Sequence, residues 1–310
     1  MLEASCLSAH QRVRRGLLGV AVWPWLAACS TPLPLDRRSA VPGADAAAAA
    51  RLRDCAEAHG LSAYRQLTDI SVAYDGQWRP LVGRIQPEVV DAGFRGRSEE
   101  RLVPAAGVVA QAYTGAQGRK QVAWRRGGGA GTAGGRGDVA VWLNGTLSAE
   151  AARQQAAALV AEAYGLFLLG PLWLIDRGMG MAPAGTERVD GRLCDVIDVW
   201  VTPGLGLSSN DRLALCIDRE GSLMRRVRFT LEGFVSTRGA VAEVDTFDHA
   251  RHFGITWPMR SFERIVHPIA LPAHDWHITG LDVNRGFQWQ DVSGPVFTGL
   301  AAAPAAPLQR

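Results

Sequence analysis

The chain has 310 residues, of which 33 are Lys or Arg, 30 are Asp or Glu and 47% are hydrophobic. Residues 1–28 hold three of the basic residues and one of the acidic residues, which leaves 30 basic and 29 acidic residues after them. This balance gives no electrostatic case for nucleic-acid binding, and the length allows one large domain or two small ones.

Residues 12–29 have the pattern of an export signal. Three arginines precede an apolar run over residues 16–28, which is shorter than the roughly 20 residues of a spanning helix and contains the helix breaker Pro24. The run ends in Leu26-Ala-Ala-Cys29, which resembles the lipobox of bacterial lipoproteins. The resemblance implies that Cys29 becomes the acylated first residue of the mature chain. A cleavable signal followed by a chance cysteine is the alternative.

Residues 30–43 are polar and rich in proline, which predicts a flexible tether, and residues 44–59 predict a helix that ends at Gly60. Alternating apolar and polar residues then predict seven strands. These are residues 68–74, 78–85, 89–95, 101–103, 107–114, 120–125 and 139–143. The Asp-Gly pair at residues 75–76 is typical of a tight hairpin turn, and the glycine-rich residues 127–137 indicate a loop.

Residues 148–169 predict the clearest helix, with Ser148 as its cap and Gly170-Pro171 as its end. Apolar side chains surround its second half, so we expect it to be buried on most sides. Further strands are predicted at residues 186–189, 194–201, 212–218, 223–231, 241–247, 255–265 and 277–283. Because strands and helices do not alternate regularly, the expected fold class is α+β, a curved antiparallel β-sheet (half-barrel) wrapped around the apolar helix.

This order of elements resembles the fold of bacterial lipoprotein-localisation carriers of the LolA/LolB type. The resemblance rests mainly on Asp218-Arg-Glu-Gly-Ser-Leu-Met224, followed by Phe247-Asp-His-Ala-Arg-His-Phe-Gly-Ile-Thr-Trp-Pro-Met-Arg260. Together these segments are similar to the turn, strand and Gly-Ile-x-x-Pro ending of such domains. The likeness implies a half-open barrel that helices close over an apolar cavity. The greater length and the glycine-rich insertion depart from that pattern.

Apolar residues near the end of the predicted helix are candidates for the lining of a ligand pocket. They are Leu166, Phe167, Leu172 and Trp173. Apolar and aromatic side chains line most ligand cavities, so these residues could surround an acyl chain. Packing within the core is the alternative.

One cluster of side chains has the chemistry of metal ligands. His267, His274 and His277, with Asp275, lie within eleven residues and could hold zinc. A loop that runs into a strand explains them equally well, and no metal is expected. Residues 129–134 match G-x-G-x-x-G but precede a predicted strand instead of a helix, so neither a nucleotide site nor a cofactor is expected.

Cys194 and Cys216 are candidates for a disulfide bond. They lie on two predicted strands at equal distances from Leu205 in the connecting turn, so a simple hairpin would place them opposite each other. An oxidising compartment permits the bond. Two buried thiols are the alternative, and Cys55 would stay unpaired.

These features predict a monomeric lipoprotein on the periplasmic side of the outer membrane. Ser30, the residue after the cysteine, favours the outer membrane by resemblance to enteric lipoproteins. It would bind a lipid or other hydrophobic ligand or act in envelope assembly. There are two alternatives. One is a periplasmic hydrolase, with or without a metal, and the other is a non-catalytic structural or adaptor lipoprotein. The expected organisation is a signal peptide (1–28), a lipidated tether (29–44), a single domain (45–296) and a disordered tail (297–310).

Overall fold

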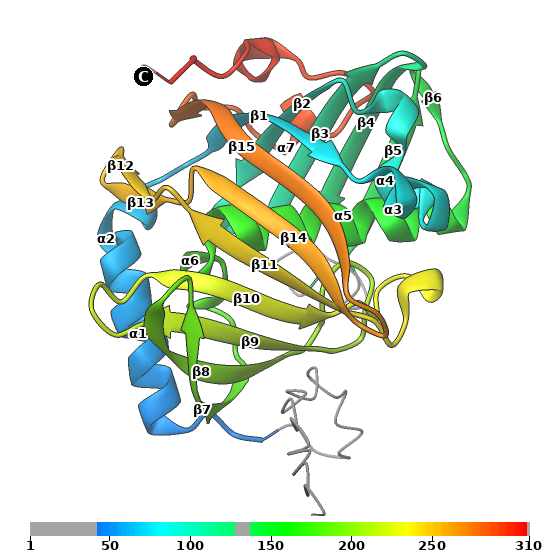
Figure 1. Cartoon of the computed structure of the whole chain (residues 1–310). Coiled ribbons are helices and arrows are strands. Elements are labelled where there is room, and N and C mark those ends of the chain that lie inside the picture. The colour runs from blue at the N-terminus through cyan, green and yellow to red at the C-terminus, as the bar shows by residue number, and fades with distance from the viewer. Residues whose placement is uncertain (1–41, 128–136, 309–310) are drawn as a thin grey trace, which may run out of the picture. The chain divides into compact units, whose positions relative to one another are not determined.

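The computed structural model describes residues 42–127 and 137–308. The predicted signal peptide, Cys29, nearly all of the tether and most of the glycine-rich loop lie outside the described residues. The described part is built mainly from strands, with a few helices (Figure 1). None of its helices combines the length and the apolar character needed to cross a membrane.

The strands are β1 (Ile70–Trp78), β2 (Arg97–Val103), β3 (Val108–Gly115), β4 (Gly118–Arg125), β5 (Asp138–Leu143), β6 (Thr146–Leu147), β7 (Gly180–Val189), β8 (Arg192–Val201), β9 (Asp211–Asp218), β10 (Met224–Thr230), β11 (Val241–Phe247), β12 (Ala250–His252), β13 (Ile255–Trp257), β14 (Arg260–His267) and β15 (Leu271–Val283). The α-helices are α1 (Ala46–His59), α2 (Leu61–Tyr64), α3 (Pro80–Ile85), α4 (Pro87–Val90), α5 (Ala151–Leu169), α6 (Pro171–Leu174) and α7 (Trp289–Val292). Short 3-10 helices are η1 (Ala92–Phe94), η2 (Pro104–Ala106), η4 (Val235–Thr237) and η5 (Gly299–Ala302).

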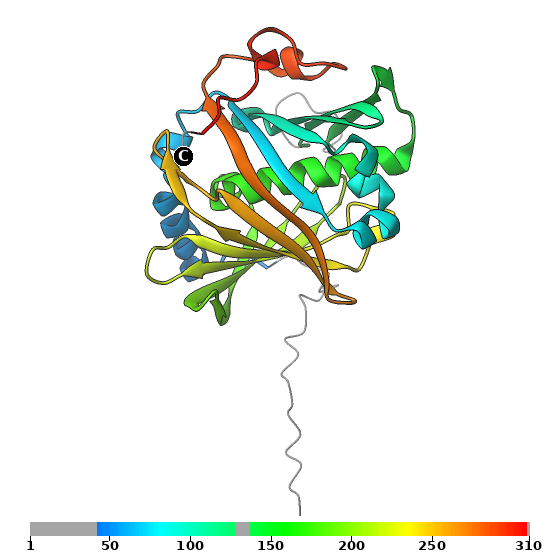
Figure 2. The ribbon, with the colours of Figure 1, turned by 45° about the horizontal axis from the view of Figure 1, so that its top comes forward.

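Thirteen of the described strands form one antiparallel sheet in the order β6-β5-β4-β3-β2-β1-β15-β14-β11-β10-β9-β8-β7. The last described strand, β15, therefore pairs with the first described strand, β1. The sheet bends around α5, which lies along its concave side (Figures 1 and 2). The edge strands β6 and β7 are not neighbours in this order, so the sheet is a half-barrel. The predicted fold class is confirmed.

The helix α5 forms the centre of the core. Every residue from Ala156 to Leu169 is buried, because apolar side chains surround the helix and the sheet wraps around it. The helix begins three residues after Ser148, the predicted cap, and ends where Gly170 adopts a positive φ of 53° ahead of Pro171. Each fully buried Leu or Phe contributes about 1.5–3 kcal/mol to folding, so this helix organises much of the apolar core.

Two of the predicted strands are wrong. Residues 78–85 and 89–95 were expected to be extended, but α3 and α4 occupy most of this stretch. Each helix begins at a proline, Pro80 or Pro87. Proline fixes φ near the helical value, and its missing N–H is not needed at the first helical position. In this segment the preference of the two prolines for a helix start therefore has a stronger effect than the alternation of apolar residues, which favours a strand.

The hairpin turn predicted at Asp75-Gly76 is also wrong. Both residues continue β1, where they lie opposite His277 and Trp276 of β15. A Cβ atom on Gly76 would lie 2.6 Å from the Cβ of Trp276. The glycine is therefore needed for the close approach of two strands, not for a turn.

The C-terminal segment is packed, in contrast to the disordered tail predicted from its composition. The buried guanidinium of Arg101 on β2 donates hydrogen bonds to the backbone carbonyls of Ala301 (2.9 Å) and Ala303 (2.7 Å). Pro307 forms a bridge with Gly280 of β15. A buried cation requires polar partners, and the carbonyl groups of this segment supply them.

Cys194 and Cys216 are free, buried thiols, which corrects the expected disulfide bond. The β8–β9 hairpin places Cys194 opposite Asp218 and Cys216 opposite Val196, so the register differs by two residues from a simple hairpin. Diagonal neighbours lie about 7–8 Å apart in an antiparallel pair, whereas bridged cysteines have Cα atoms about 4.4–6.8 Å apart. The two thiols pack in a small apolar cluster.

Candidate functional site

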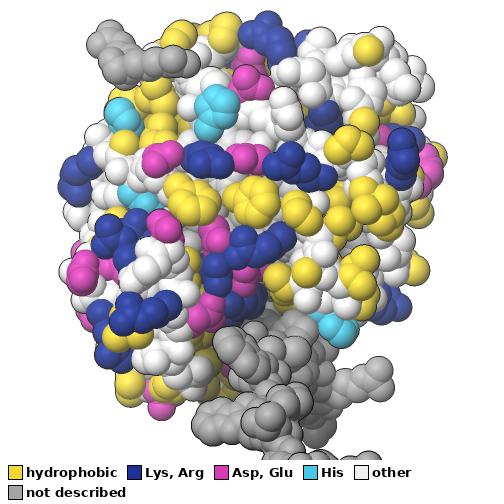
Figure 3. All heavy atoms as spheres, viewed as in Figure 1, with side chains coloured by type: hydrophobic (Ala, Val, Ile, Leu, Met, Phe, Trp, Pro, Cys, Tyr) yellow, Lys and Arg dark blue, Asp and Glu magenta, His cyan; other side chains and the backbone are white. Residues whose placement is uncertain are grey.

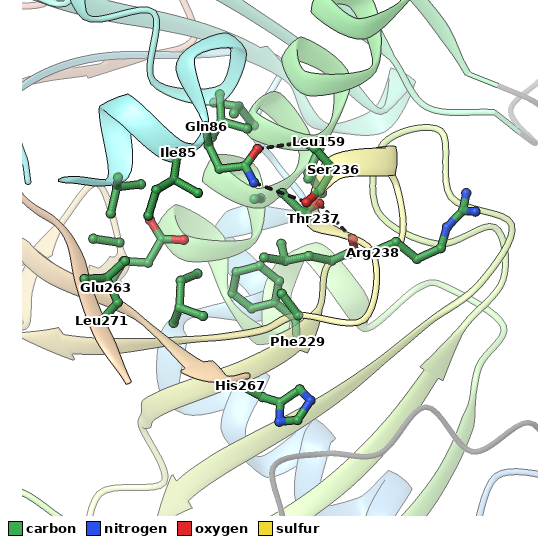
Figure 4. A pocket seen from close by; sticks show the side chains of 18 of the residues that line it. Ile85, Gln86, Leu159, Phe229, Ser236, Thr237, Arg238, Glu263, His267 and Leu271 are labelled. Atoms are coloured by element: carbon green, nitrogen blue, oxygen red, sulfur yellow. Dashed lines mark hydrogen bonds between the residues drawn. The ribbon is translucent and has the colours of Figure 1, made fainter. Parts of the chain in front are cut away.

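A cavity of about 500 Å³ lies between α5 and the concave face of the sheet (Figure 4). The helix supplies one wall, and β10, β14 and β15 supply the other. The α3 segment, the connection between β10 and β11, and the connection between β14 and β15 also contribute to the lining. The volume falls within the range of small-molecule pockets, roughly 300–1,000 Å³.

One side of α5 forms the inner wall of the cavity. Leu159, Ala163 and Phe167 are spaced by four residues and therefore share one face of the helix. Phe229 of β10 and Leu271 of β15 line the cavity from the sheet. The rings of Phe167 and Phe229 are in contact, with centroids 5.4 Å apart. The wall is thus largely apolar.

Exposed apolar side chains and one pair of polar side chains lie at the mouth of the cavity. Ile85 and Ile269 belong to the lining and are 51% and 61% exposed. The hydroxyl of Ser236 donates to Oε1 of Gln86 (2.6 Å), and Nε2 of Gln86 donates to the Ser236 carbonyl (3.2 Å; Figure 4). Water competes for these exposed hydrogen bonds, so separating the two residues costs little.

Glu263 of β14 is the one acidic side chain among the residues that line the cavity. The residue is 9% exposed. Burial raises the pKa of its carboxyl group to about 7, although the positive charge of Arg95 opposes this shift. At neutral pH the carboxyl group is therefore present in both protonation states.

Aromatic rings close the cavity on the side of β1 and β15. Trp78 and Tyr164 line it, and the ring of His274 is stacked between Trp78 and Trp276, with centroids 4.3 and 4.5 Å apart. The hydroxyl of Tyr164 lies 3.0 Å from Nδ1 of His274. Burial lowers the pKa of His274 well below its usual value, so the ring is neutral at this position.

The structure separates the four residues predicted to line a ligand pocket. Phe167 lines the cavity described above, whereas Leu166 is buried in the core and does not belong to that lining. Leu172 and Trp173 line a second cavity of about 630 Å³. Contact between any of these residues and a ligand stays a prediction.

A hydrogen-bond cluster around Glu162 of α5 borders the second cavity. The buried carboxylate accepts bonds from the indoles of Trp124 (2.8 Å) and Trp173 (3.1 Å) and from the guanidinium groups of Arg126 (2.9 Å) and Arg177 (3.2 Å). Burial would raise the pKa of Glu162, but the two positive charges outweigh it and lower the pKa. These groups bind one another, so the cluster holds α5 against β4 and α6.

The three histidines considered as metal ligands do not converge. His274 is buried and does not belong to the cavity lining, His267 is an exposed residue of that lining, and His277 is exposed three positions after His274 on β15. Successive side chains of a strand point to opposite faces, so His274 and His277 face apart. Within residues 42–127 and 137–308, no group of three or more His, Cys, Asp or Glu side chains could hold a metal ion.

Sequence reasoning did not identify Glu263, Ile85 or Ser236 as residues of a site. Charged side chains occur at successive positions of β14, Glu263 and Arg264, so alternation does not reveal which face is buried. Ser236 lies in a connection between strands that has no periodic pattern. The pattern of β14 therefore gave no signal that Glu263 faces a cavity.

Comparisons with known proteins find structural likeness without a family assignment. No family model matches the chain, and no curated protein matches it. Among solved structures, the chain is similar to a DUF1329 family protein from Desulfovibrio piger, with 12% identity, a TM-score of 0.47 and coverage of 78% of this chain and 95% of that one. It is similar to a LolA superfamily protein from Nitrosomonas europaea, with 10% identity, a TM-score of 0.40 and coverage of 79% and 96%. It is also similar to lipoprotein LppX from Mycobacterium tuberculosis, with 17% identity, a TM-score of 0.25 and coverage of 61% and 91%.

Proposed function

We propose that this chain is a lipoprotein of the bacterial envelope whose domain binds the apolar chain of a lipid beside α5. The observation that carries the proposal is the cavity of about 500 Å³, with its largely apolar walls and exposed isoleucines. Burial of apolar surface contributes about 25 cal/mol per Å². A flexible acyl chain would therefore be stabilised there without a fixed set of hydrogen bonds.

The proposal includes attachment to the membrane through a lipid on Cys29. The basic start, the apolar run and the Leu-Ala-Ala-Cys ending of residues 12–29 support it. The anchor would hold the binding domain close to the membrane from which its ligand comes. We propose the periplasmic face of the outer membrane as that location.

Metabolic labelling with palmitate tests the anchor. Replacing Cys29 by Ser should abolish labelling and release the protein from the membrane fraction. Cys55→Ser is the matched control, because Cys55 is a buried thiol of the domain and its loss should leave labelling intact. Labelling that persists in the Cys29→Ser variant would refute the anchor.

Displacement of a fluorescent acyl-chain probe tests the binding site. Ala163→Phe places a phenyl ring in the cavity from the helix wall, and we expect it to weaken probe binding at least about tenfold, since the ring occupies the volume that the chain needs. Ile85→Asp places a charge among the exposed apolar side chains of the lining and should also weaken binding.

Leu300→Asp is the matched control for Ile85→Asp, because Leu300 is 63% exposed and lies outside the cavity lining. It should bind the probe like the unmodified protein. Circular dichroism shows whether each variant is folded. Unmodified protein that binds no acyl probe, or folded variants that all bind it equally, would contradict the proposed site.

A further inference from the structure

The carboxyl group of Glu263 is directed into an otherwise largely apolar space. The residue lies on β14 opposite Val244 of β11 and His274 of β15. Figure 4 shows its side chain among the apolar side chains of Ile85 and Leu271. Apolar pockets usually contain a small number of polar groups that set the orientation and the identity of the ligand.

Other buried carboxylates of this protein have hydrogen-bond donors beside them. Glu100 accepts a bond from Nε2 of Gln111 at 2.5 Å, and Asp211 accepts bonds from the Thr230 hydroxyl and the Leu205 N–H. By contrast, no residue in the described part of the chain forms a hydrogen bond or an ion pair with Glu263. A buried polar group without a protein partner calls for an explanation.

The groups that face Glu263 do not supply that partner. The Tyr164 hydroxyl is engaged with His274, and Arg95 donates its hydrogen bonds to the carbonyls of Val89 and Val90. The charge of Arg95 therefore acts on Glu263 only through space. Glu263 itself belongs to the lining of the cavity.

We propose that Glu263 determines the specificity of the cavity by forming a hydrogen bond with a hydroxyl group carried on the acyl chain of the ligand. This inference rests on the proposed function and narrows the ligand class from any lipid chain to a hydroxylated one. A hydroxyl group both donates and accepts hydrogen bonds, so it can pair with Glu263 whether or not the carboxyl group is ionised.

The physical reason is the loss of water when the cavity fills. A plain chain displaces the water that solvates Glu263 and offers no hydrogen bond in return, whereas a chain with a correctly placed hydroxyl group restores the lost bond. We expect the best hydroxylated chain to bind about tenfold more tightly than the plain chain, which corresponds to about 1.4 kcal/mol.

The test is competition against a fluorescent acyl probe on the full-length protein. The competitors are a saturated fatty acid and three hydroxy acids of the same length, with the hydroxyl group near the head, in the middle or at the far end. For the unmodified protein, one hydroxy acid should displace the probe at about one tenth of the concentration of the plain acid. Equal displacement by all four would overturn the inference.

Two substitutions at the site sharpen the test. Glu263→Leu should bind the plain acid at least as tightly as the unmodified protein and lose the preference for the hydroxy acid. Glu263→Gln keeps the shape and the hydrogen bonding of the side chain and should retain part of the preference. Glu100→Gln is the matched control, because Glu100 is another buried carboxyl outside the cavity lining, and it should retain the full preference.

The outcomes separate this inference from the proposed function. A preference that persists undiminished in folded Glu263→Leu would overturn the role of Glu263 while leaving acyl-chain binding intact. Failure of every fatty acid to displace the probe, or failure of the probe to bind, would overturn the proposed function together with the inference that rests on it.

Discussion

Tyr164 of α5 and His274 of β15 form a hydrogen bond, with 3.0 Å between the tyrosine hydroxyl and Nδ1 of the histidine. The bond joins the central helix to the middle of the sheet. Trp78 covers the histidine ring and also lines the cavity. The position of the aromatic wall is therefore fixed relative to α5 by one buried polar contact.

Replacing Tyr164 by Phe should lower the free energy of unfolding by about 1–3 kcal/mol, because a buried nitrogen of His274 loses its partner. Denaturant titration measures the change. The double variant with His274→Phe removes both polar groups, so its loss should be smaller than the sum of the two single losses by at least about 0.5 kcal/mol. Additive losses would show that the bond contributes nothing.

Glu162→Ala should be among the most destabilising substitutions on α5. It leaves two partly buried guanidinium groups and two indoles without their shared, fully buried acceptor, and breaking a buried ion pair costs about 3–5 kcal/mol. Glu150→Ala is the control at the start of the same helix, because its exposed pair with Arg153 contributes about 1 kcal/mol or less. Similar unfolding free energies for the two variants would contradict this assignment.

Acid should destabilise the fold through His59. Its Nδ1 donates to the Thr256 carbonyl (2.9 Å), its Nε2 accepts from the Met224 N–H (3.1 Å), and burial lowers its pKa from 6.5 to about 4. The folded state thus binds fewer protons, so this contribution to stability is present above pH 6.5 and is lost as the pH falls towards 4.

Unfolding free energies measured across this pH range check the assignment. The loss of stability on acidification should be smaller in His59→Gln than in the unmodified protein. The exposed His267 provides the control, and His267→Gln should keep the original pH dependence. An unchanged pH dependence in His59→Gln would assign the acid sensitivity to other groups.

Truncation after Thr298 should destabilise the domain by about 2 kcal/mol or more. The truncation removes two carbonyl acceptors of the buried Arg101 guanidinium, and each hydrogen bond to a charged group contributes about 1.5–3 kcal/mol. Thermal unfolding measures the effect. Truncation after Leu308 is the control and should leave stability unchanged. Equal stability of the two truncated proteins would show that the segment after Thr298 does not contribute to folding.

The sequence predicted the parts of the fold that depend on local pattern. The apolar second half of the helix at residues 148–169 indicates burial on most sides. Because antiparallel strands precede and follow this helix in the chain, a sheet wrapped around it is the simplest arrangement that buries it. Where two local signals competed, the prediction was wrong. At residues 78–95, proline at first helical positions prevailed over apolar alternation.

The sequence by itself thus determined most of the strands, the two long helices and the burial of α5, because hydrophobic period and helix ends are properties of neighbouring residues. Only the tertiary structure decided the rest. The register of the β8–β9 hairpin keeps Cys194 and Cys216 diagonal, and the packing of β1 against β15 needs Gly76. The cavity, with Glu263 facing into it, forms where the sheet closes around the helix, and its walls come from segments far apart in the chain. No local sequence pattern encodes which distant residues come into contact. The residues that form the cavity could therefore be identified only from the tertiary structure.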